Sequence, residues 1–253
     1  MFPIIVRVGP VTIYSFGLMM AVAFLASGLI VTKELDRKGL DANLGSPLVF
    51  WAAVGGLVGA RLWVIVDDFA GFLDAPVSFL LSGAGFVWYG GLIGGIVAMS
   101  AFIHRHRLPW LVTADCVAAG VPLGHAIGRI GCQLAGDGDW GKETTVPWGM
   151  AYPDAIIGWD YPPGVRVHPT PLYEAAAYAL IFVLLWSNRR RLEPAGTMLA
   201  AYFVLAGVAR FLIEFLRTEP RIVLDLTAAQ LVSIAIVLAG LTLLGRGRVA
   251  RAG

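Results

Sequence analysis

The sequence predicts an all-α integral membrane protein with seven transmembrane helices, an N-terminus outside the cell membrane and a cytoplasmic C-terminus. Three observations lead to this fold class: little charge, apolar runs of membrane-spanning length, and basic residues grouped in alternate connections. Of the 253 residues, 58% are hydrophobic and 14% are charged, whereas a soluble domain carries about 25% charged residues. Lipid is therefore the expected solvent for most of this chain.

Seven hydrophobic segments follow one another, each close to the roughly 20 residues that a helix needs to cross a bilayer. In chain order they are residues 11–32, 47–66, 85–103, 111–133, 171–188, 196–216 and 226–245. Basic residues follow the first, third, fifth and seventh segments: Lys33, Arg37, Lys38; Arg105, Arg107; Arg189, Arg190, Arg191; and Arg246, Arg248, Arg251. The positive-inside rule places those connections in the cytoplasm and the N-terminus outside.

Two connections on the expected outer side have a character of their own. Residues 67–84 are moderately apolar and contain Pro76, which predicts a short arm or interfacial helix on the outer face. Residues 135–170 form a polar outer loop, and its three tryptophans (Trp140, Trp148 and Trp159) fit an interfacial belt. Since no internal repeat is visible, residues 1–253 are expected to form a single membrane domain.

Composition excludes several classes of protein. A formal net charge of +2 is too small to indicate nucleic-acid binding. Cys116 and Cys132 fall on one expected helix, about 24 Å apart, which is beyond the reach of a disulfide. The first ten residues lack the features of a cleavable signal peptide. Only four histidines are present, two of them in "HRHR", so no metal site is predicted.

Charged side chains within membrane spans are costly and point to function by default. They occur in the second, fourth, fifth and sixth segments: Arg61; Asp115, His125 and Arg129; His168, Tyr173 and Glu174; and Arg210, Glu214 and Arg217. Most of them fall near the expected outer ends of the spans, and Asp115 is the main exception.

Arg210, Glu214 and Arg217 are spaced i, i+4, i+7 and would share one face of a helix. Two interpretations are open. Glu214 holds both arginines in a structural ion pair, or the two guanidinium groups converge on an anion while Glu214 orients them. Arginine suits phosphate because its planar fork binds two oxygens at once.

Arg129 has no carboxylate three or four residues before it, and Gln133 stands four residues after it. Its partner must therefore come from another helix, from the outer loop or from a ligand. His125, one turn earlier, is interpreted as an interior histidine bonded to a neighbouring carbonyl group. A cavity lined by Arg129, Arg210 and Arg217, open to the outer leaflet, would fit an anionic lipid headgroup.

Glycines are concentrated in "VWYGGLIGGIVA" at the third segment. Gly94 and Gly95 indicate close packing of helices through small residues. At Gly90 and Gly91 two interpretations are open: close packing of helices, or a bent backbone that lines the cavity, with the phenol of Tyr89 pointing into it.

The motifs "GHAIGRIGC…GDGDWG", "HPTPLYE" and "ARFLIEFLR", preceded by "GPVTIYSFGLMM" and "VWYGGLIGG", resemble those of phosphatidylglycerol–prolipoprotein diacylglyceryl transferases over nearly the whole chain. The resemblance implies a bacterial inner-membrane enzyme that needs no cofactor. It would transfer the sn-1,2-diacylglyceryl group of phosphatidylglycerol to the lipobox cysteine of a prolipoprotein signal peptide. The products would be a thioether and glycerol 1-phosphate, and the enzyme is expected to be a monomer.

The same resemblance assigns roles by position. Arg129, Arg210, Glu214 and Tyr89 take the catalytic positions. The substrate-binding positions are Arg217, Arg61, Gly136, Asp137, Asp139, Gly141, His168, Tyr173, Glu174, Gly90 and Gly91.

The chain departs from the family pattern at several places. Tyr89 stands where many members have a histidine that is a candidate base, Cys132 where many have asparagine, and Ala206 where a tyrosine is common. Phe16 replaces the tyrosine of a Tyr-Gly pair, and Asp137 and Asp139 compete for the position of a glutamate before the Trp-Gly pair. A divergent paralogue, or a protein that binds or translocates anionic lipid, therefore remains the alternative.

Overall fold

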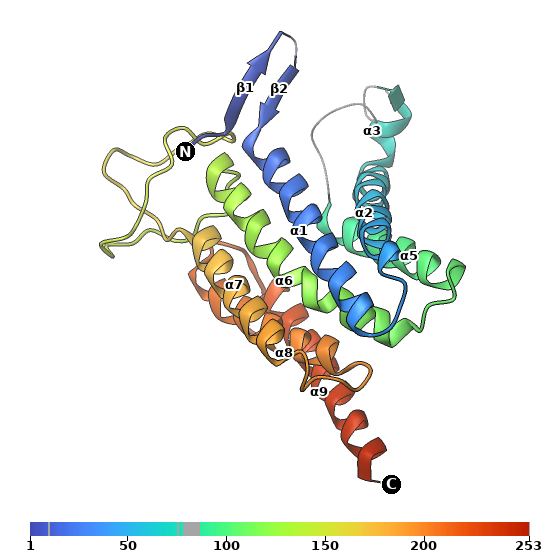
Figure 1. Ribbon diagram of the computed structural model, residues 1–253. Helices are drawn as coiled ribbons and strands as arrows, with labels where there is room; N and C mark the ends of the chain where they lie inside the picture. Colours follow the sequence, from blue (N-terminus) through green and yellow to red (C-terminus); the bar gives the residue numbers. More distant parts are fainter. Residues whose placement is uncertain (10, 75, 78–86, 253) are drawn as a thin grey trace. The chain divides into compact units, whose positions relative to one another are not determined.

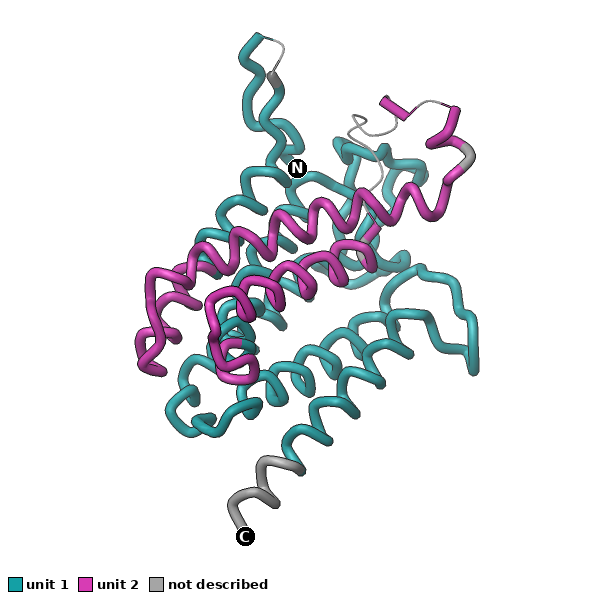
Figure 2. Tube along the Cα trace, turned by 90° about the vertical axis from the view of Figure 1, so that its right-hand side faces the viewer, with its two compact units in different colours: residues 1–27, 114–253 teal, residues 28–113 magenta. Residues whose placement is uncertain are grey.

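The computed structural model describes residues 1–9, 11–74, 76–77 and 87–252, and it is mostly helical (Figure 1). The described residues form two compact units (Figure 2). One comprises residues 1–27 and 114–253, and the other residues 28–113. The long helix α1 (Ser15–Arg37) belongs to both.

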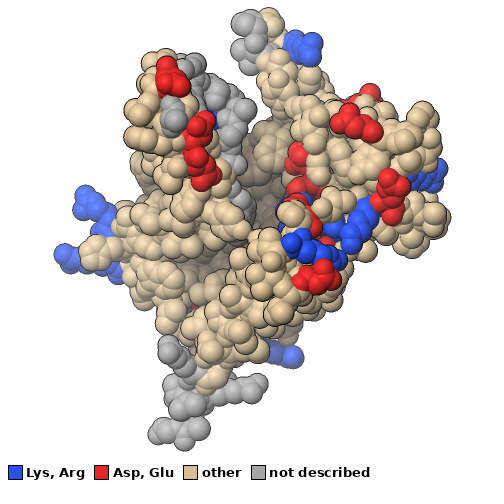
Figure 3. Space-filling model, turned by 180° about the vertical axis from the view of Figure 1, so that it is seen from behind, with Lys and Arg blue, Asp and Glu red and all other residues tan. Residues whose placement is uncertain are grey.

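Six helical stretches in the described part of the chain are long and apolar enough to cross a membrane. They are Ser15–Arg37, Ala42–Asp67, Trp110–Ala135, Thr170–Asn188, Thr197–Leu216 and Ala228–Gly245. These six confirm a multi-pass, all-α membrane protein. The third expected span forms helix α5 (Trp88–Arg105), whose 18 residues do not belong to this set. Much of the surface in view carries no charge, as lipid-facing helices require (Figure 3).

The unit of residues 28–113 is built on a close pair of helices, α2 (Gly45–Asp67) and α5. Glycines allow the approach: a Cβ on Gly59 would lie 2.8 Å from the Cα of Gly94, and one on Gly94 would meet the carbonyl oxygen of Gly55. Close packing at Gly94 is thereby confirmed. The interpretation of a bent backbone at Gly90 and Gly91 is wrong, because both are helical; a Cβ on Gly90 would lie 2.5 Å from the Cβ of Trp63.

The expected outer arm is described only in part. Residues Phe69–Asp74 form the short helix α3, directly after α2. Residues 75 and 78–84 of that arm lie outside the described residues. A 3-10 turn, Ala42–Leu44, joins α1 to α2 in the same unit.

The other unit begins with an antiparallel hairpin of β1 (Ile4–Val8) and β2 (Val11–Tyr14), in which Val6 pairs with Ile13. The first span was expected to begin at Val11, which is wrong: the helix begins at Ser15. The β-branched residues before it favour a strand once a partner strand is available.

Besides the first part of α1, four helices contribute to this unit: α6 (Trp110–Ala135, from residue 114 on), α7 (Thr170–Asn188), α8 (Thr197–Ile213) and α9 (Ala228–Ala252). The 3-10 helix η2 (Glu214–Leu216) and a small hairpin, β3 (Arg221–Val223) with β4 (Leu226–Thr227), join α8 to α9. Small residues let α8 and α9 approach: a Cβ on Gly207 would lie 2.9 Å from the carbonyl oxygen of Ser233. All four helices bring one end to the same region, where the charged residues gather.

Asp115, the main exception among the charged residues of the expected spans, has a structural role. Its side chain is buried in α6, and its two oxygens accept hydrogen bonds from the backbone N–H groups of Gly196 (2.7 Å) and Leu199 (2.8 Å). It therefore caps the N-terminus of α8 from a neighbouring helix, where a negative charge is favourable.

The loop between α6 and α7, residues 136–169, which we call the outer loop after its expected side, has a small core of its own. Trp140, Tyr152 and Val167 are buried together, and Trp159 packs against them. The rings of Trp140 and Tyr152 stack with centroids 5.0 Å apart. The expected interfacial belt is therefore wrong for Trp140, which holds the loop together, whereas Trp148 is exposed.

Candidate active site

Glu174, near the start of α7, is fully buried. It lies among three arginines: Arg129 of α6, Arg210 of α8 and Arg217, which follows η2. Its Oε1 accepts a hydrogen bond of 2.8 Å from Nη1 of Arg210, and its Oε2 lies 2.7 Å from Nε of Arg129. Nη1 of Arg217 is 3.7 Å from Oε1. Arg129 has found its partner on another helix, which is one of the sources that the sequence left open.

Asp139 of the outer loop joins two of the same arginines. Its Oδ1 accepts a hydrogen bond of 2.8 Å from Nη2 of Arg217, and its Oδ2 pairs with Nη1 of Arg129. Burial of Asp139 opposes its ionisation, but Arg129 and Arg217 outweigh that effect and hold the pKa of the carboxyl below its ordinary value. Of the two competing aspartates, Asp139 makes these ion pairs, while Asp137 accepts from the N–H of Asp139 at 3.4 Å.

Glu214 is the third carboxylate of the cluster and is also buried. Its Oε2 lies 2.9 Å from Nη2 of Arg210 and 3.6 Å from Nε of Arg217. The expectation that one helical face carries all three residues is wrong, because α8 ends at Ile213 and Arg217 has an extended backbone. Arg217 reaches the cluster because the chain turns through η2 after Ile213, and not because of helical spacing.

Glycine is required where the outer loop meets the end of the helices. Gly141 forms a β-bridge with Arg217, and a Cβ at Gly141 would meet the carbonyl oxygen of Leu216 and lie 2.8 Å from Thr170. Gly136 has a φ of +63°, in the left-handed region that favours glycine, and a Cβ there would lie 2.8 Å from the Cα of Ala155.

His125 contacts charged residues of the cluster. Its Nε2 lies 3.7 Å from Oε2 of Glu174 and accepts from Nε of Arg129 at 3.4 Å. Its ring stacks on Tyr178 with centroids 3.6 Å apart. The interpretation of His125 as bonded to a carbonyl is therefore wrong. Sequence reasoning missed Tyr178, although it stands one helical turn after Glu174 in "YEAAAY".

Two of the carboxylates are more deeply buried than the arginines they bind. The side chains of Arg129 and Arg210 are 19% and 22% exposed, whereas those of Glu174 and Glu214 are 0% exposed. Glu174 and Glu214 therefore stand behind the guanidinium groups of Arg129 and Arg210 and orient them, while part of each of these two guanidinium groups remains accessible. We call the six residues Arg129, Asp139, Glu174, Arg210, Glu214 and Arg217 the arginine–carboxylate network.

The remaining candidate residues make none of these ion pairs. Nδ1 of His168 lies 3.2 Å from the hydroxyl of Tyr173, which accepts a hydrogen bond of 2.7 Å from the indole of Trp148. Four further candidates, Tyr89, Gly90, Gly91 and Arg61, belong to the unit of residues 28–113, whereas the network lies wholly in the other unit.

One set of side chains has the spacing of a metal site. The ligand atoms of Cys132, Asp137 and Asp139 lie within 4.8 Å of one another. Both oxygens of Asp139 are already paired with arginines, however, and those positive charges oppose the binding of a cation. The set therefore fits the arginine network better than a metal.

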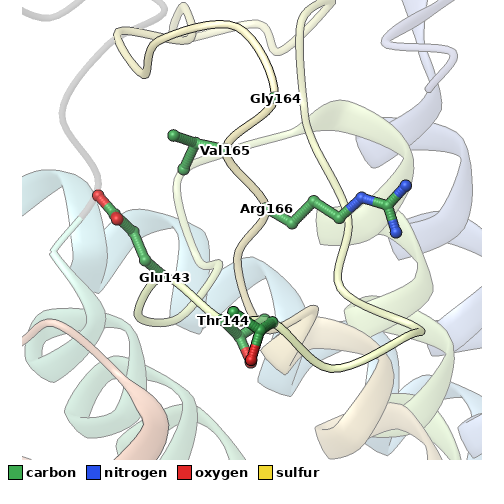
Figure 4. A pocket seen from close by; sticks show the side chains of 6 residues that line it. Glu143, Thr144, Gly164, Val165 and Arg166 are labelled. Carbon is green, nitrogen blue, oxygen red and sulfur yellow. The ribbon is translucent and has the colours of Figure 1, made fainter.

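The outer loop also has an open hollow of about 490 Å³ (Figure 4). Its lining residues are Glu143, Thr144, Thr145, Gly164, Val165 and Arg166. Figure 4 shows the side chains of Glu143 and Arg166 pointing in different directions, so the two charges do not converge on one ligand there. The network is the better-built site.

Fold and site together define a multi-pass membrane protein with a buried arginine–carboxylate network at one end of its helices. A family model described as "Prolipoprotein diacylglyceryl transferase" matches residues 3–246. The chain belongs to this family.

Relatives from several bacteria agree, and each is named phosphatidylglycerol–prolipoprotein diacylglyceryl transferase. The chain is 36% identical to that of Coxiella burnetii (strain Dugway 5J108-111) over 220 residues, covering 85% of this chain and 81% of the relative. It is 30% identical to that of Clostridium tetani over 241 residues, covering 94% and 95%. The Methylococcus capsulatus protein is 34% identical over 261 residues, covering 96% and 94%. The resemblance seen in the motifs is thereby confirmed.

Proposed function

We propose that this protein transfers the diacylglyceryl group of phosphatidylglycerol to the cysteine thiol of a prolipoprotein, with the arginine–carboxylate network as the site for the lipid phosphate. One observation carries the assignment of the site: partly exposed guanidinium groups of Arg129 and Arg210 are held by the buried Glu174 and Glu214. The family and the names of its members supply the reaction.

The reaction is a displacement at carbon. The sulfur of the lipobox cysteine forms a bond to glyceryl C3, and the bond from C3 to the phosphate oxygen breaks. The electron pair of that bond stays on the phosphate, which leaves as glycerol 1-phosphate, and the thiol proton passes to a base. Negative charge grows on the leaving phosphate, so fixed guanidinium groups stabilise the transition state more than the ground state.

Arg129 and Arg210 are the groups we assign to the leaving phosphate. Each is fixed by two carboxylates, so little reorganisation is needed when charge develops. Arg217, the least exposed of the three, binds Asp139 and the carbonyl oxygen of Asp139, which supports the outer loop over the site. Substrate bound at the two arginines would then contact four residues of the outer loop: Gly136, Asp137, Asp139 and Gly141.

Several groups are candidates for the base that takes the thiol proton. A free thiol has a pKa of about 8.5, so it is mostly protonated near neutral pH. Because the thiolate is the nucleophile, that proton must be removed before the sulfur attacks. Candidates are Tyr89, His168, a carboxylate, or a lowering of the thiol pKa by the arginines alone. Arg61, Gly90, Gly91, Tyr173 and Glu174 complete the proposed substrate-binding set.

We further propose that α5 also crosses the membrane, which brings the number of spans to seven, and that the N-terminus faces outward. Both units would form one domain of a monomer in the bacterial inner membrane. The three arginines Arg189, Arg190 and Arg191 follow α7 at the end opposite Glu174. Under the positive-inside rule that end is cytoplasmic, so the network faces the outer leaflet. Both substrates are expected to reach it there.

Transfer is tested with purified protein, phosphatidylglycerol and a lipobox peptide, by measuring thioether peptide and glycerol phosphate. Arg129→Ala and Arg210→Ala should abolish both products while the protein still inserts into membranes. Arg221→Ala is the matched control, because Arg221 is an exposed arginine paired with Asp225. No product from the wild-type protein would contradict the proposal. Lipid flux across liposomes without a covalent product would favour the translocating alternative instead.

A further inference from the structure

Thr227, the last residue before α9, touches the network through a side chain to which the family resemblance assigned no role. Its hydroxyl Oγ1 donates a hydrogen bond of 2.8 Å to Oε1 of Glu214. An ionised carboxylate can only accept, so the direction of this bond is fixed. The other oxygen of Glu214, Oε2, faces Arg210 and Arg217.

The local sequence explains why the hydroxyl is held in place. The segment "TAAQ", Thr227 to Gln230, begins α9 as a capping box. The backbone N–H of Gln230 donates to Oγ1 of Thr227 at 3.2 Å, and the backbone N–H of Thr227 donates to Oε1 of Gln230 at 3.1 Å. Because Oγ1 accepts from the helix, its single proton is free to point at Glu214.

Burial makes this contact consequential. Thr227, Gln230 and Glu214 are all almost fully buried. Without the hydroxyl, Oε1 of Glu214 would lose the one side-chain hydrogen bond that the structure gives it, in surroundings where a carboxylate oxygen is costly to leave unpaired. The carboxylate would then turn to share its arginines between both oxygens, and Arg210 and Arg217 would shift with it.

We propose that Thr227 is a positioning residue: it fixes the rotation of Glu214, and through Glu214 it aligns the guanidinium groups of Arg210 and Arg217. The inference rests on the proposed function, since alignment matters for the charge that develops on the leaving phosphate. It also joins the start of α9 to the site, so that the cap of one helix sets the geometry of charges on another.

Kinetics of purified variants test this proposal. Thr227→Val removes the hydroxyl at nearly constant shape and should lower kcat about tenfold, which corresponds to the loss of one hydrogen bond to a charged group. KM for phosphatidylglycerol should change less than about twofold, because alignment acts mainly on the transition state. Thr227→Ser keeps the donor and should restore kcat, and Thr227→Cys, a weaker donor, should fall between them.

Two controls separate positioning from stability. Thr242→Val removes an exposed hydroxyl of the same helix, which donates only to the carbonyl oxygen of Ala239, and should leave both constants unchanged. Gln230→Ala removes one half of the capping box but keeps the backbone N–H that holds Thr227. It should lower the unfolding temperature by roughly 2–4 °C, as Thr227→Val does, with a smaller loss of kcat.

The outcomes are distinct. Wild-type kcat in Thr227→Val, or an equal loss of kcat in Gln230→Ala at equal unfolding temperature, would overturn the positioning role while leaving the transferase function intact. Failure of Thr227→Ser to restore kcat would overturn it as well. An inactive wild-type protein would contradict the proposed function itself.

Discussion

Nε of Arg129, near the end of α6, lies 2.7 Å from Oε2 of Glu174, near the start of α7. The whole outer loop separates the two residues in sequence, and that loop returns Asp139 to the same arginine. Glu174 also binds Arg210 of α8, so a single buried carboxylate connects three helices. The network is therefore both a structural joint and the proposed phosphate site.

Replacing Glu174 should be severely damaging. Glu174→Gln removes the buried negative charge that faces Arg129 and Arg210, and breaking one side of such a pair costs about 3–5 kcal/mol. We expect a lower unfolding temperature in detergent and a loss of transfer of at least about 100-fold. Glu219→Gln is the control, because Glu219 lies 3.2 Å from Arg217 but is half exposed. Equal effects of the two substitutions would contradict the account.

Lysine should not replace Arg210. The two Nη atoms of Arg210 reach different carboxylates, Nη1 to Glu174 and Nη2 to Glu214, which the single ammonium of lysine cannot do with the same geometry. Arg210→Lys should therefore lower transfer by at least about tenfold despite keeping the charge. Rates are compared with those of Arg221→Lys on the exposed hairpin. A fully active Arg210→Lys protein would show that charge alone suffices.

Gly141 should tolerate no side chain. A Cβ there would overlap the carbonyl oxygen of Leu216, which belongs to backbone and cannot move independently. Gly141→Ala should destabilise the protein by about 1–3 kcal/mol and reduce transfer, because the loop that carries Asp139 is displaced. Gly245→Ala, with open space around it, should have little effect. Unfolding curves of both variants decide the matter, and a Gly141→Ala curve equal to the wild-type curve would argue against this contact.

Acid should weaken the contribution of Asp139 only at low pH. The pKa of Asp139 is lowered in the folded protein, so its stabilising effect is fully present above the unfolded pKa of about 3.9 and is lost as pH falls through the lower folded value. Asp139→Asn should therefore be less stable than wild type near neutral pH, and the difference should shrink below about pH 4. Thermal unfolding from neutral to acid pH measures this difference. A gap that stays constant to the acid limit would contradict the pairing.

Sequence patterns predicted the helices well because apolar runs of membrane-spanning length leave few alternatives. They placed Arg129, Arg210 and Glu214 as candidates because charge is rare in such runs. Sequence patterns could not predict the pairing of β1 with β2, because each strand forms only against the other. Val11 was therefore assigned to a helix. The end of α8 at Ile213 could not be predicted for a similar reason, because the 3-10 turn after it depends on contacts with the loop at Gly141 and Lys142.

The partners within the network could not be read from the sequence. Glu174 and Asp139 reach Arg129 only through the fold, and neither stands within one helical turn of it. Thr227 was detectable in principle, because "TAAQ" before an apolar run is the pattern of a capping box. Its bond to Glu214 was not, since that bond depends on how α8 and α9 pack.

The most direct test of the central claim is complementation of a bacterial strain depleted of its own prolipoprotein diacylglyceryl transferase. The wild-type chain and Arg221→Ala should restore growth and lipidation of a reporter lipoprotein. Arg129→Ala, present in the membrane at the same level, should restore neither. Complementation by Arg129→Ala, or failure of the wild-type chain despite normal insertion, would contradict an arginine-based transferase.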